Sequence, residues 1–205
     1  MSAVANAGAG VKYCITMIEK TVRRARMFTG RLLNLEVLEV ELEPGRVARR
    51  ELVIHPGAAV IIAQLPDGRY VFVRQFRKAI ERELLEAVAG TLAPGEDPTA
   101  CAARELREET GYRHRKLQKL GIIYPAPGYS TEILHVFYAL LDPEREAVDP
   151  DEDEKLTVVL VTGERFEKMI AAGQVEDSKT LAAWLLFRSG ADSLEKRAEP
   201  RPVTF

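Results

Sequence analysis

The stretch GTLAPGEDPTACAARELREETGY, residues 90–112 of a chain of 205, carries the most specific pattern in the sequence. Asp97 and Pro98 favour a helix start, because aspartate accepts hydrogen bonds from free amides and proline lacks the amide that would go unpaired there. Gly111 favours a helix end, since glycine readily adopts the left-handed conformation that closes many helices. We therefore predict a helix between these residues, preceded by a loop rich in glycine and proline.

Three glutamates stand on one face of this predicted helix. Glu105, Glu108 and Glu109 are spaced i, i+3 and i+4, which places them side by side. Like charges at this spacing destabilise a helix by about 0.2–0.5 kcal/mol per pair, so they need solvent or a counter-charge. A solvated acidic face, partly offset by Arg104 and Arg107, is the ordinary interpretation. Clustered carboxylates beside a flexible loop also suit a hard cation such as Mg²⁺ or Mn²⁺.

The spacing of the whole stretch resembles the Nudix box, G-x5-E-x7-R-E-U-x-E-E-x-G-U, in which U is a bulky apolar residue. Every fixed position is met, from Gly90 through Glu96 to RELREETGY at residues 104–112. The resemblance implies a hydrolase that cleaves a nucleoside diphosphate linked to another group. It also implies a divalent metal cofactor, Mg²⁺ with Mn²⁺ as a substitute, and an α/β/α sandwich around a mixed sheet.

The same resemblance implies roles for individual residues. Glu105, Glu109 and the carbonyl of Ala89 would ligate Mg²⁺, while Glu108 would complete the catalytic cluster. Arg104, also assigned to that cluster, would pair with Glu96 and orient the loop and helix. The residues with structural roles in the box would be Gly90, Glu96 and Gly111.

Two segments downstream of the box point to a substrate. Pro127, in YPAPGYSTE at residues 124–132, resembles the proline signature of ADP-ribose pyrophosphatases, although a rigid turn would look the same. Glu132 is then a substrate contact or an ordinary loop acid. In DPDEDE, residues 149–154, the resemblance makes Glu152 the base that activates water and Glu154 a further metal ligand. A solvated acidic loop is the alternative.

The N-terminal part adds weaker indications of the same subfamily. By resemblance, Phe28 would stack on adenine, and Arg50 and Arg77 would hold phosphate or the terminal ribose, although such residues also serve as packing or surface groups. A β subdomain at this place implies a homodimer. The predicted reaction converts ADP-ribose to AMP and ribose 5-phosphate. Alternatives are hydrolysis of GDP-mannose or UDP-glucose, removal of oxidised nucleoside triphosphates, and a non-catalytic sensor of ADP-ribose-like ligands.

Strand patterns and helix patterns interleave along the chain, which predicts an α/β fold with a mixed sheet. Hairpins are predicted from the turn residues between two pairs of runs, and two helices from apolar residues at i, i+3 and i+4. The predicted hairpins join 35–42 to 47–54 and 58–64 to 70–74, further strands cover 122–124, 134–141 and 156–161, and the helices contain Phe166, Met169, Ile170 and Leu181, Trp184, Leu185. Residues 11–26 fit a helix or a strand equally well.

The composition of the chain excludes several classes of partner and site. A net charge of −2 provides no basic excess for nucleic acid, and the histidines and two cysteines lack metal-ligand spacing. With few cysteines, no signal peptide and no apolar run of about 20 residues, we predict a cytoplasmic protein without membrane contact. The predicted divisions are an N-terminal extension, partly disordered, at 1–26, a dimerisation subdomain at 27–57, a Nudix domain at 58–190 and a tail at 191–205.

Overall fold

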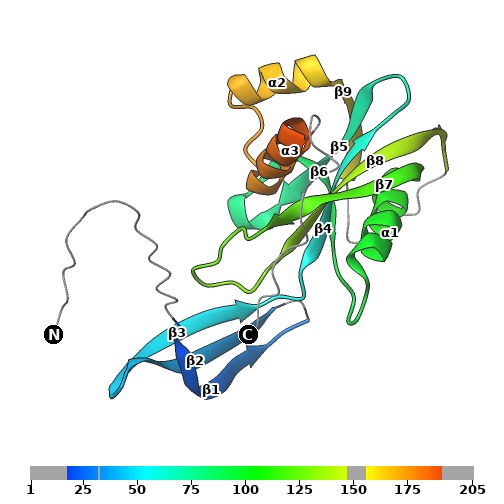
Figure 1. Cartoon of the computed structure of the whole chain (residues 1–205). Helices are drawn as coiled ribbons and strands as arrows, with labels where there is room; N and C mark the ends of the chain where they lie inside the picture. The colour runs from blue at the N-terminus through cyan, green and yellow to red at the C-terminus, as the bar shows by residue number, and fades with distance from the viewer. Residues whose placement is uncertain (1–17, 32, 147–155, 191–205) are drawn as a thin grey trace, which may run out of the picture.

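The computed structural model describes residues 18–31, 33–146 and 156–190, and its chain path is drawn in Figure 1. Strands and helices alternate in the mixed order that the sequence predicts. The elements are β1 (Lys20–Thr29), β2 (Asn34–Glu43), β3 (Arg46–Ile54), β4 (Ala58–Gln64), β5 (Arg69–Arg77), a 3-10 turn (Lys78–Ile80), β6 (Arg82–Thr91), α1 (Pro98–Thr110), β7 (Tyr112–Ile123), β8 (Leu134–Arg145), β9 (Leu156–Thr162), α2 (Gly163–Ala171) and α3 (Ser178–Gly190).

The first three strands form a separate antiparallel sheet in the order β1-β2-β3. The predicted hairpin between 35–42 and 47–54 is confirmed, with Leu38 opposite Arg50. Residues from Lys20 onward, which fit either a helix or a strand, form β1 because β2 offers them an edge to pair with. This sheet thus begins before residue 27, where the sequence places the start of the subdomain; the division into domains stays a prediction.

The second sheet has six strands in the order β7-β8-β4-β6-β5-β9. It is mixed, because β4 runs parallel to β8 while its pairing with β6 is antiparallel. Strand β4, with sequence AAVIIAQ, is buried on both faces, which explains its continuous apolar run. Val60 and Ile62 point to one side of the sheet, and Ala59 and Ile61 point to the other.

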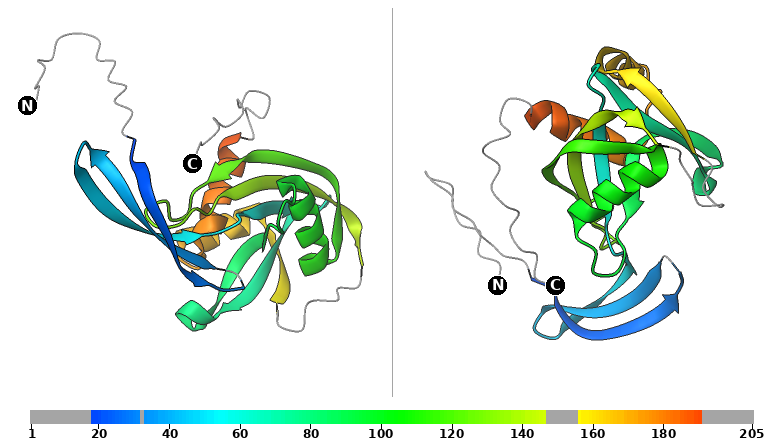
Figure 2. Two further views of the ribbon diagram at one scale, coloured as in Figure 1. Left: turned by 90° about the horizontal axis from the view of Figure 1, so that it is seen from below. Right: turned by 90° about the vertical axis from the view of Figure 1, so that its right-hand side faces the viewer.

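Helices cover both faces of this sheet, as Figures 1 and 2 show. Helix α1 packs against one face through Cys101, Ala102 and Leu106. Helices α2 and α3 cover the opposite face, where Phe166 and Trp184 join the buried cluster. The predicted α/β/α sandwich, preceded by a small β sheet, is therefore confirmed.

Some local predictions fail where tertiary pairing decides. The predicted hairpin between 58–64 and 70–74 is present only next to its turn, because β4 inserts between β8 and β6 over most of its length. Strand β6 was not predicted, since its sequence RELLEAVAGT is rich in residues that also favour helices. Strand β7 covers far more than 122–124. In α3, Leu185 faces solvent with 68% exposure and is not part of the core.

The two sheets are linked at the end of β3. The Val53 amide donates to the Tyr129 carbonyl at 2.7 Å, and the Thr131 amide donates to the Val53 carbonyl at 3.0 Å. The last residues of β3 thus pair with the loop between β7 and β8 through Val53 and Ser130. Within the described residues, no helix is both long and apolar enough to cross a membrane.

Candidate active site

Helix α1 is fixed at both ends by the residues that the sequence singles out. The Asp97 carboxylate accepts from the amides of Thr99 at 2.8 Å and Ala100 at 3.2 Å, and these bonds lower its pKa. Gly111 has φ 73° and donates its amide to the Arg107 carbonyl. Because the apolar face of α1 is buried in the core, its acidic face is directed toward a cavity.

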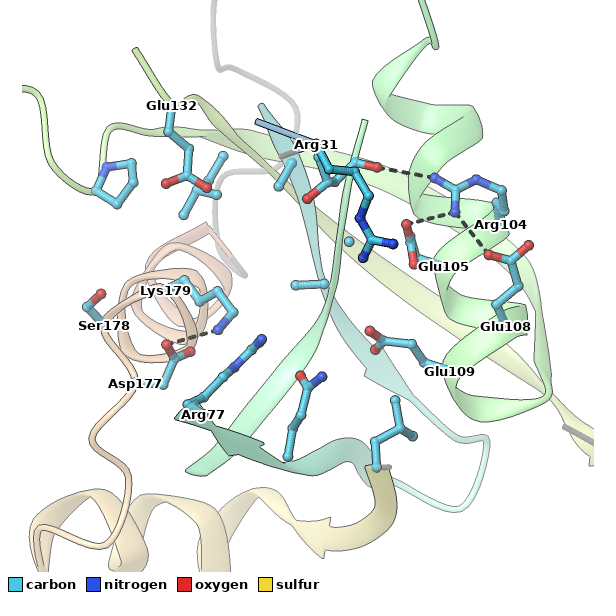
Figure 3. Close-up of a pocket in the computed structure, with 18 residues that line it drawn as sticks. Arg31, Arg77, Arg104, Glu105, Glu108, Glu109, Glu132, Asp177, Ser178 and Lys179 are labelled. Atoms are coloured by element: carbon cyan, nitrogen blue, oxygen red, sulfur yellow. Dashed lines mark hydrogen bonds and ion pairs between the residues drawn. The ribbon is translucent and has the colours of Figure 1, made fainter. Parts of the chain in front are cut away.

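This cavity has a volume of about 830 Å³ and lies between α1, the sheet and the start of α3 (Figure 3). Charged and polar side chains dominate its wall. Its lining residues are Arg31, Ala58, Gln75, Arg77, Ala89, Gly90, Thr91, Arg104, Glu105, Glu108, Glu109, Pro125, Glu132, Leu134, Leu156, Asp177, Ser178 and Lys179.

The acidic wall of the cavity consists of Glu105, Glu108 and Glu109 (Figure 3). Their burial differs: the Glu105 side chain is 13% exposed, the Glu108 side chain is 47% exposed, and Glu109 is buried. Glu105 lies directly on the backbone of β6, where a Cβ on Gly90 would be 1.8 Å from the Glu105 Cδ. Glycine at position 90 therefore makes the space that the Glu105 carboxylate occupies.

Arg104 connects this acidic wall to the loop before α1. Its guanidinium donates to Glu96 at 2.9 and 3.0 Å, to Glu105 at 2.7 Å and to Glu108 at 2.9 Å. The pairing between Arg104 and Glu96 that the resemblance implies is thus present. Hydrogen bonds from Arg104 and from the Ala93 amide lower the pKa of Glu96 to about 2. Both groups therefore stay charged over the whole physiological range.

The opposite wall contains Arg77 of β5 and, at the start of α3, Asp177 and Lys179. Behind them lies Glu86 of β6, whose side chain is 1% exposed and accepts from Arg77 Nε at 2.7 Å and Nη2 at 2.6 Å. Lys179 Nζ donates to the same carboxylate. Although burial raises the pKa of Glu86, the bonds from Arg77 and Lys179 outweigh it and lower that pKa below its usual value.

The donor chemistry of the acidic wall fits a hard divalent cation. Carboxylate oxygens are the preferred ligands of Mg²⁺, and Glu105, Glu108 and Glu109 supply three carboxylates from one helix face. As the side chains stand, no three His, Cys, Asp or Glu residues in the described ranges are gathered closely enough to hold a metal ion. Arg104 donates to one oxygen of Glu105 and to one oxygen of Glu108, so its guanidinium competes with a metal ion for these two oxygens.

Most of the residues predicted from the box meet at the cavity. Those that line it are Ala89, Gly90, Arg104, Glu105, Glu108 and Glu109, together with Arg77 and Glu132. Pro127 does not line it, whereas Pro125 of the same loop does. Phe28, on β1, is 59% exposed, and Arg50, on β3, pairs with Glu19; neither lines the cavity. Glu152 and Glu154 lie outside the described residues.

Several lining residues were missed by the sequence reasoning. Arg31 comes from the turn between β1 and β2, Gln75 from β5, and Asp177, Ser178 and Lys179 from the start of α3. The one sequence signal near α3 is the pattern Asp177-Ser178-Lys179-Thr180, in which Asp177 accepts from the Thr180 amide and starts the helix. That signal locates a helix start but not its place beside the cavity.

Comparisons with known proteins agree with this geometry. The family model described as NUDIX domain matches residues 53–184. An ADP-ribose pyrophosphatase of Bacillus subtilis is 43% identical over 169 residues, covering 80% of this chain and 90% of the relative. A methanol dehydrogenase activator of Bacillus methanolicus is 39% identical over 166 residues, with the same two coverages.

The fold comparison points the same way. The solved structure described as an ADP compounds hydrolase superposes with a TM-score of 0.74 at 22% identity, covering 86% of this chain and 96% of that one. At this identity the likeness concerns the fold alone. The family model and the Bacillus relatives cover the box and the strands around it. The chain belongs to the Nudix family.

Proposed function

We propose that this protein hydrolyses the pyrophosphate bond of ADP-ribose to AMP and ribose 5-phosphate with the help of Mg²⁺. The observation that carries the proposal is the acidic face of α1 lining a polar cavity, in a chain that is 43% identical to an ADP-ribose pyrophosphatase. A cavity of about 830 Å³ is in the size range of sites for small organic ligands.

The metal ion would be held by the carboxylates of Glu105, Glu108 and Glu109. Bound there, Mg²⁺ would neutralise charge on the pyrophosphate and help to activate water. Gly90 supports this assignment, because its lack of a side chain lets the Glu105 carboxylate lie against the strand. Arg104 fixes the loop to α1 through Glu96 and keeps the box residues in their positions.

The reaction is a displacement at phosphorus. The oxygen of water forms a bond to one phosphorus, the bond from that phosphorus to the bridging oxygen breaks, and the bridging oxygen leaves with the other phosphate. A base takes a proton from the water. Glu152 is our candidate from the family resemblance, and it stays a prediction. Arg77, which lines the cavity opposite α1, is suited to bind phosphate oxygens.

The choice of ADP-ribose over another nucleoside diphosphate sugar depends on what binds the base. In the part of the cavity formed by described residues, no lining residue is aromatic, so a stacked adenine needs a partner at its margin. Phe28 is exposed on β1 of the N-terminal sheet, and Arg31, in the turn that follows β1, lines the cavity. These positions support Phe28 as the stacking residue. A homodimer with contributions from the N-terminal sheet and a cytoplasmic location remain parts of this proposal.

The test is turnover of a substrate panel by the purified protein. ADP-ribose, GDP-mannose, UDP-glucose and 8-oxo-dGTP are compared with and without Mg²⁺ or Mn²⁺, and the phosphate monoesters released are converted to inorganic phosphate and measured. We expect metal-dependent cleavage with the highest kcat/KM for ADP-ribose. Preference for another sugar nucleotide would overturn the substrate but keep the reaction. Binding of ADP-ribose without cleavage of any compound would instead support a regulatory role, in line with the name of the Bacillus methanolicus relative.

A further inference from the structure

We propose that Lys179 is a substrate-binding residue, which the buried Glu86 holds together with Arg77 as a cationic pair for a phosphate of the substrate. The inference rests on the proposed function, because it concerns how the same cavity binds a pyrophosphate. Neither Lys179 nor Glu86 belongs to the Nudix pattern at residues 90–112. Glu86 would act as a positioning residue through its two cationic partners.

The contacts among these three residues fix their geometry. Glu86 lies in β6, Arg77 in β5 and Lys179 in α3, and both cations donate to the one buried carboxylate. A carboxylate removed from water is costly unless it is paired and hydrogen-bonded. The two cations therefore stay with Glu86, and the arrangement holds the two positive groups near each other.

The polar groups of this cluster that can still form hydrogen bonds are mainly N–H donors. A guanidinium has five N–H groups, and Arg77 gives two of its own to Glu86. An ammonium has three, and Lys179 gives one to Glu86 and one to Asp177. The Asp177 oxygens accept from Lys179 and from the amide and hydroxyl of Thr180. Glu86 and Asp177 balance the formal charge, but their oxygens are already used among the described residues.

The unused donors are directed into the cavity. The side chains of Arg77 and Lys179 are 40% and 17% exposed, whereas that of Glu86 is 1% exposed. Figure 3 shows Arg77 and Lys179 extending from different elements toward the same part of the cavity, across from Glu105 and Glu109. An anion with several acceptor oxygens matches this surface, and a phosphate group is such an anion.

Hydrogen bonds hold the start of α3 against β6 and so fix the position of Lys179. The Thr180 hydroxyl accepts from the Ala87 amide at 2.7 Å, and Thr180 is fully buried. Asp177 accepts from the Thr180 amide at 3.0 Å. Since Ala87 follows Glu86 in β6, the helix start and the buried carboxylate are held by adjacent residues. A donor fixed in advance loses little entropy when the substrate binds.

Lys179→Met tests the proposal by removing the charge while keeping an unbranched side chain. Loss of a charge-assisted hydrogen bond lowers kcat/KM by about ten- to a hundredfold, and we expect most of that loss in KM. Lys168→Met is the matched control, because Lys168 lies on α2 and pairs with the exposed Glu164. Lys168→Met should leave kcat/KM and KM within about twofold of wild type.

Glu86→Gln tests the positioning role. We expect a rise in KM similar to that of Lys179→Met, and the double variant should lose much less than the product of the two single losses, because both act on the same contact. Lys179→Arg should restore part of the affinity. The melting temperature of each variant is measured alongside to detect loss of folding. If Glu86→Gln fails to fold, Lys179→Met still tests the binding role, because the Lys179 side chain borders the cavity.

A calorimetric Kd for ADP-ribose, measured in EDTA, separates the two levels of the proposal. If wild type cleaves no panel compound but Lys179→Met still weakens binding about tenfold, the proposed function fails and the binding role holds. If wild type cleaves ADP-ribose and Lys179→Met matches Lys168→Met in KM and Kd, the binding role is wrong while the function stands. Normal KM with lowered thermal stability would also overturn it, because that result indicates a purely structural lysine.

Discussion

The two walls of the cavity come from different kinds of sequence. The acidic wall belongs to one helix, so its glutamates are neighbours by spacing alone. The cationic wall joins β5, β6 and the start of α3, and Lys179 meets Glu86 across a separation of 93 positions. The spacing of residues along one helix can thus reveal the acidic wall from the sequence. The cationic wall forms only when the sheet and its covering helix have packed together.

The largest expected effect comes from the acidic wall. Glu105→Gln removes the charge of the carboxylate that lies on Gly90, and metal-assisted charge neutralisation accounts for several kcal/mol of transition-state stabilisation. We expect kcat with Mg²⁺ to fall by at least about a hundredfold. Glu164→Gln on α2, whose side chain is 79% exposed, is the control. Turnover of Glu105→Gln within tenfold of wild type would show that the metal site is assigned wrongly.

The reverse face of α1 tests whether the acidic wall depends on the core behind it. Leu106 is fully buried among strands of the six-stranded sheet, so Leu106→Ala leaves a cavity and should reduce the free energy of unfolding by about 2–5 kcal/mol. Leu185→Ala replaces an exposed leucine in α3 and should change it by less than about 0.5 kcal/mol. Denaturant unfolding measures both, and equal losses would contradict the described burial.

Gly90→Ala probes the contact between the acidic wall and β6. The added Cβ would lie 1.8 Å from Glu105 Cδ, so the carboxylate must move away. A misplacement of about 1 Å can cost up to about a hundredfold in rate, and we expect a loss of ten- to a hundredfold in kcat. At Gly121 an added Cβ would meet Leu186 at an ordinary 3.7 Å, so Gly121→Ala serves as the comparison in the same assay. Unchanged kcat in Gly90→Ala would mean that Glu105 works from another position.

The smallest expected effect concerns the loop before α1 and depends on pH. The folded pKa of Glu96 is about 2, below its ordinary value of 4.5, because Arg104 and the Ala93 amide stabilise the charged form. The stabilisation is therefore fully present above pH 4.5 and is lost as the pH falls toward 2. The melting temperature of wild type should exceed that of Glu96→Gln at neutral pH, and the difference should shrink over that acid range. A difference independent of pH would rule out the charged pair as its source.

Local sequence signals were reliable where a structure depends on close neighbours along the chain. The start at Asp97, the end at Gly111 and the spacing of the glutamates all act within one helix, and the structure contains each of them. The same reasoning missed β6, because its residues are compatible with a helix and only its pairing with β4 and β5 selects a strand. It also grouped Leu185 with Leu181 and Trp184 in one apolar pattern, although Leu185 is exposed, because the periodicity of a short helix does not define which residues a neighbouring sheet covers.

The sequence by itself determined the family pattern, the mixed α/β class and the acidic face of α1, since these follow from spacing over a few turns of chain. The tertiary structure alone decided which residues face that helix. Arg31, Arg77 and Lys179 line the same cavity although they lie far apart in sequence. The physical reason is that a buried carboxylate such as Glu86 must find its cations wherever packing brings them, and no local spacing encodes that meeting.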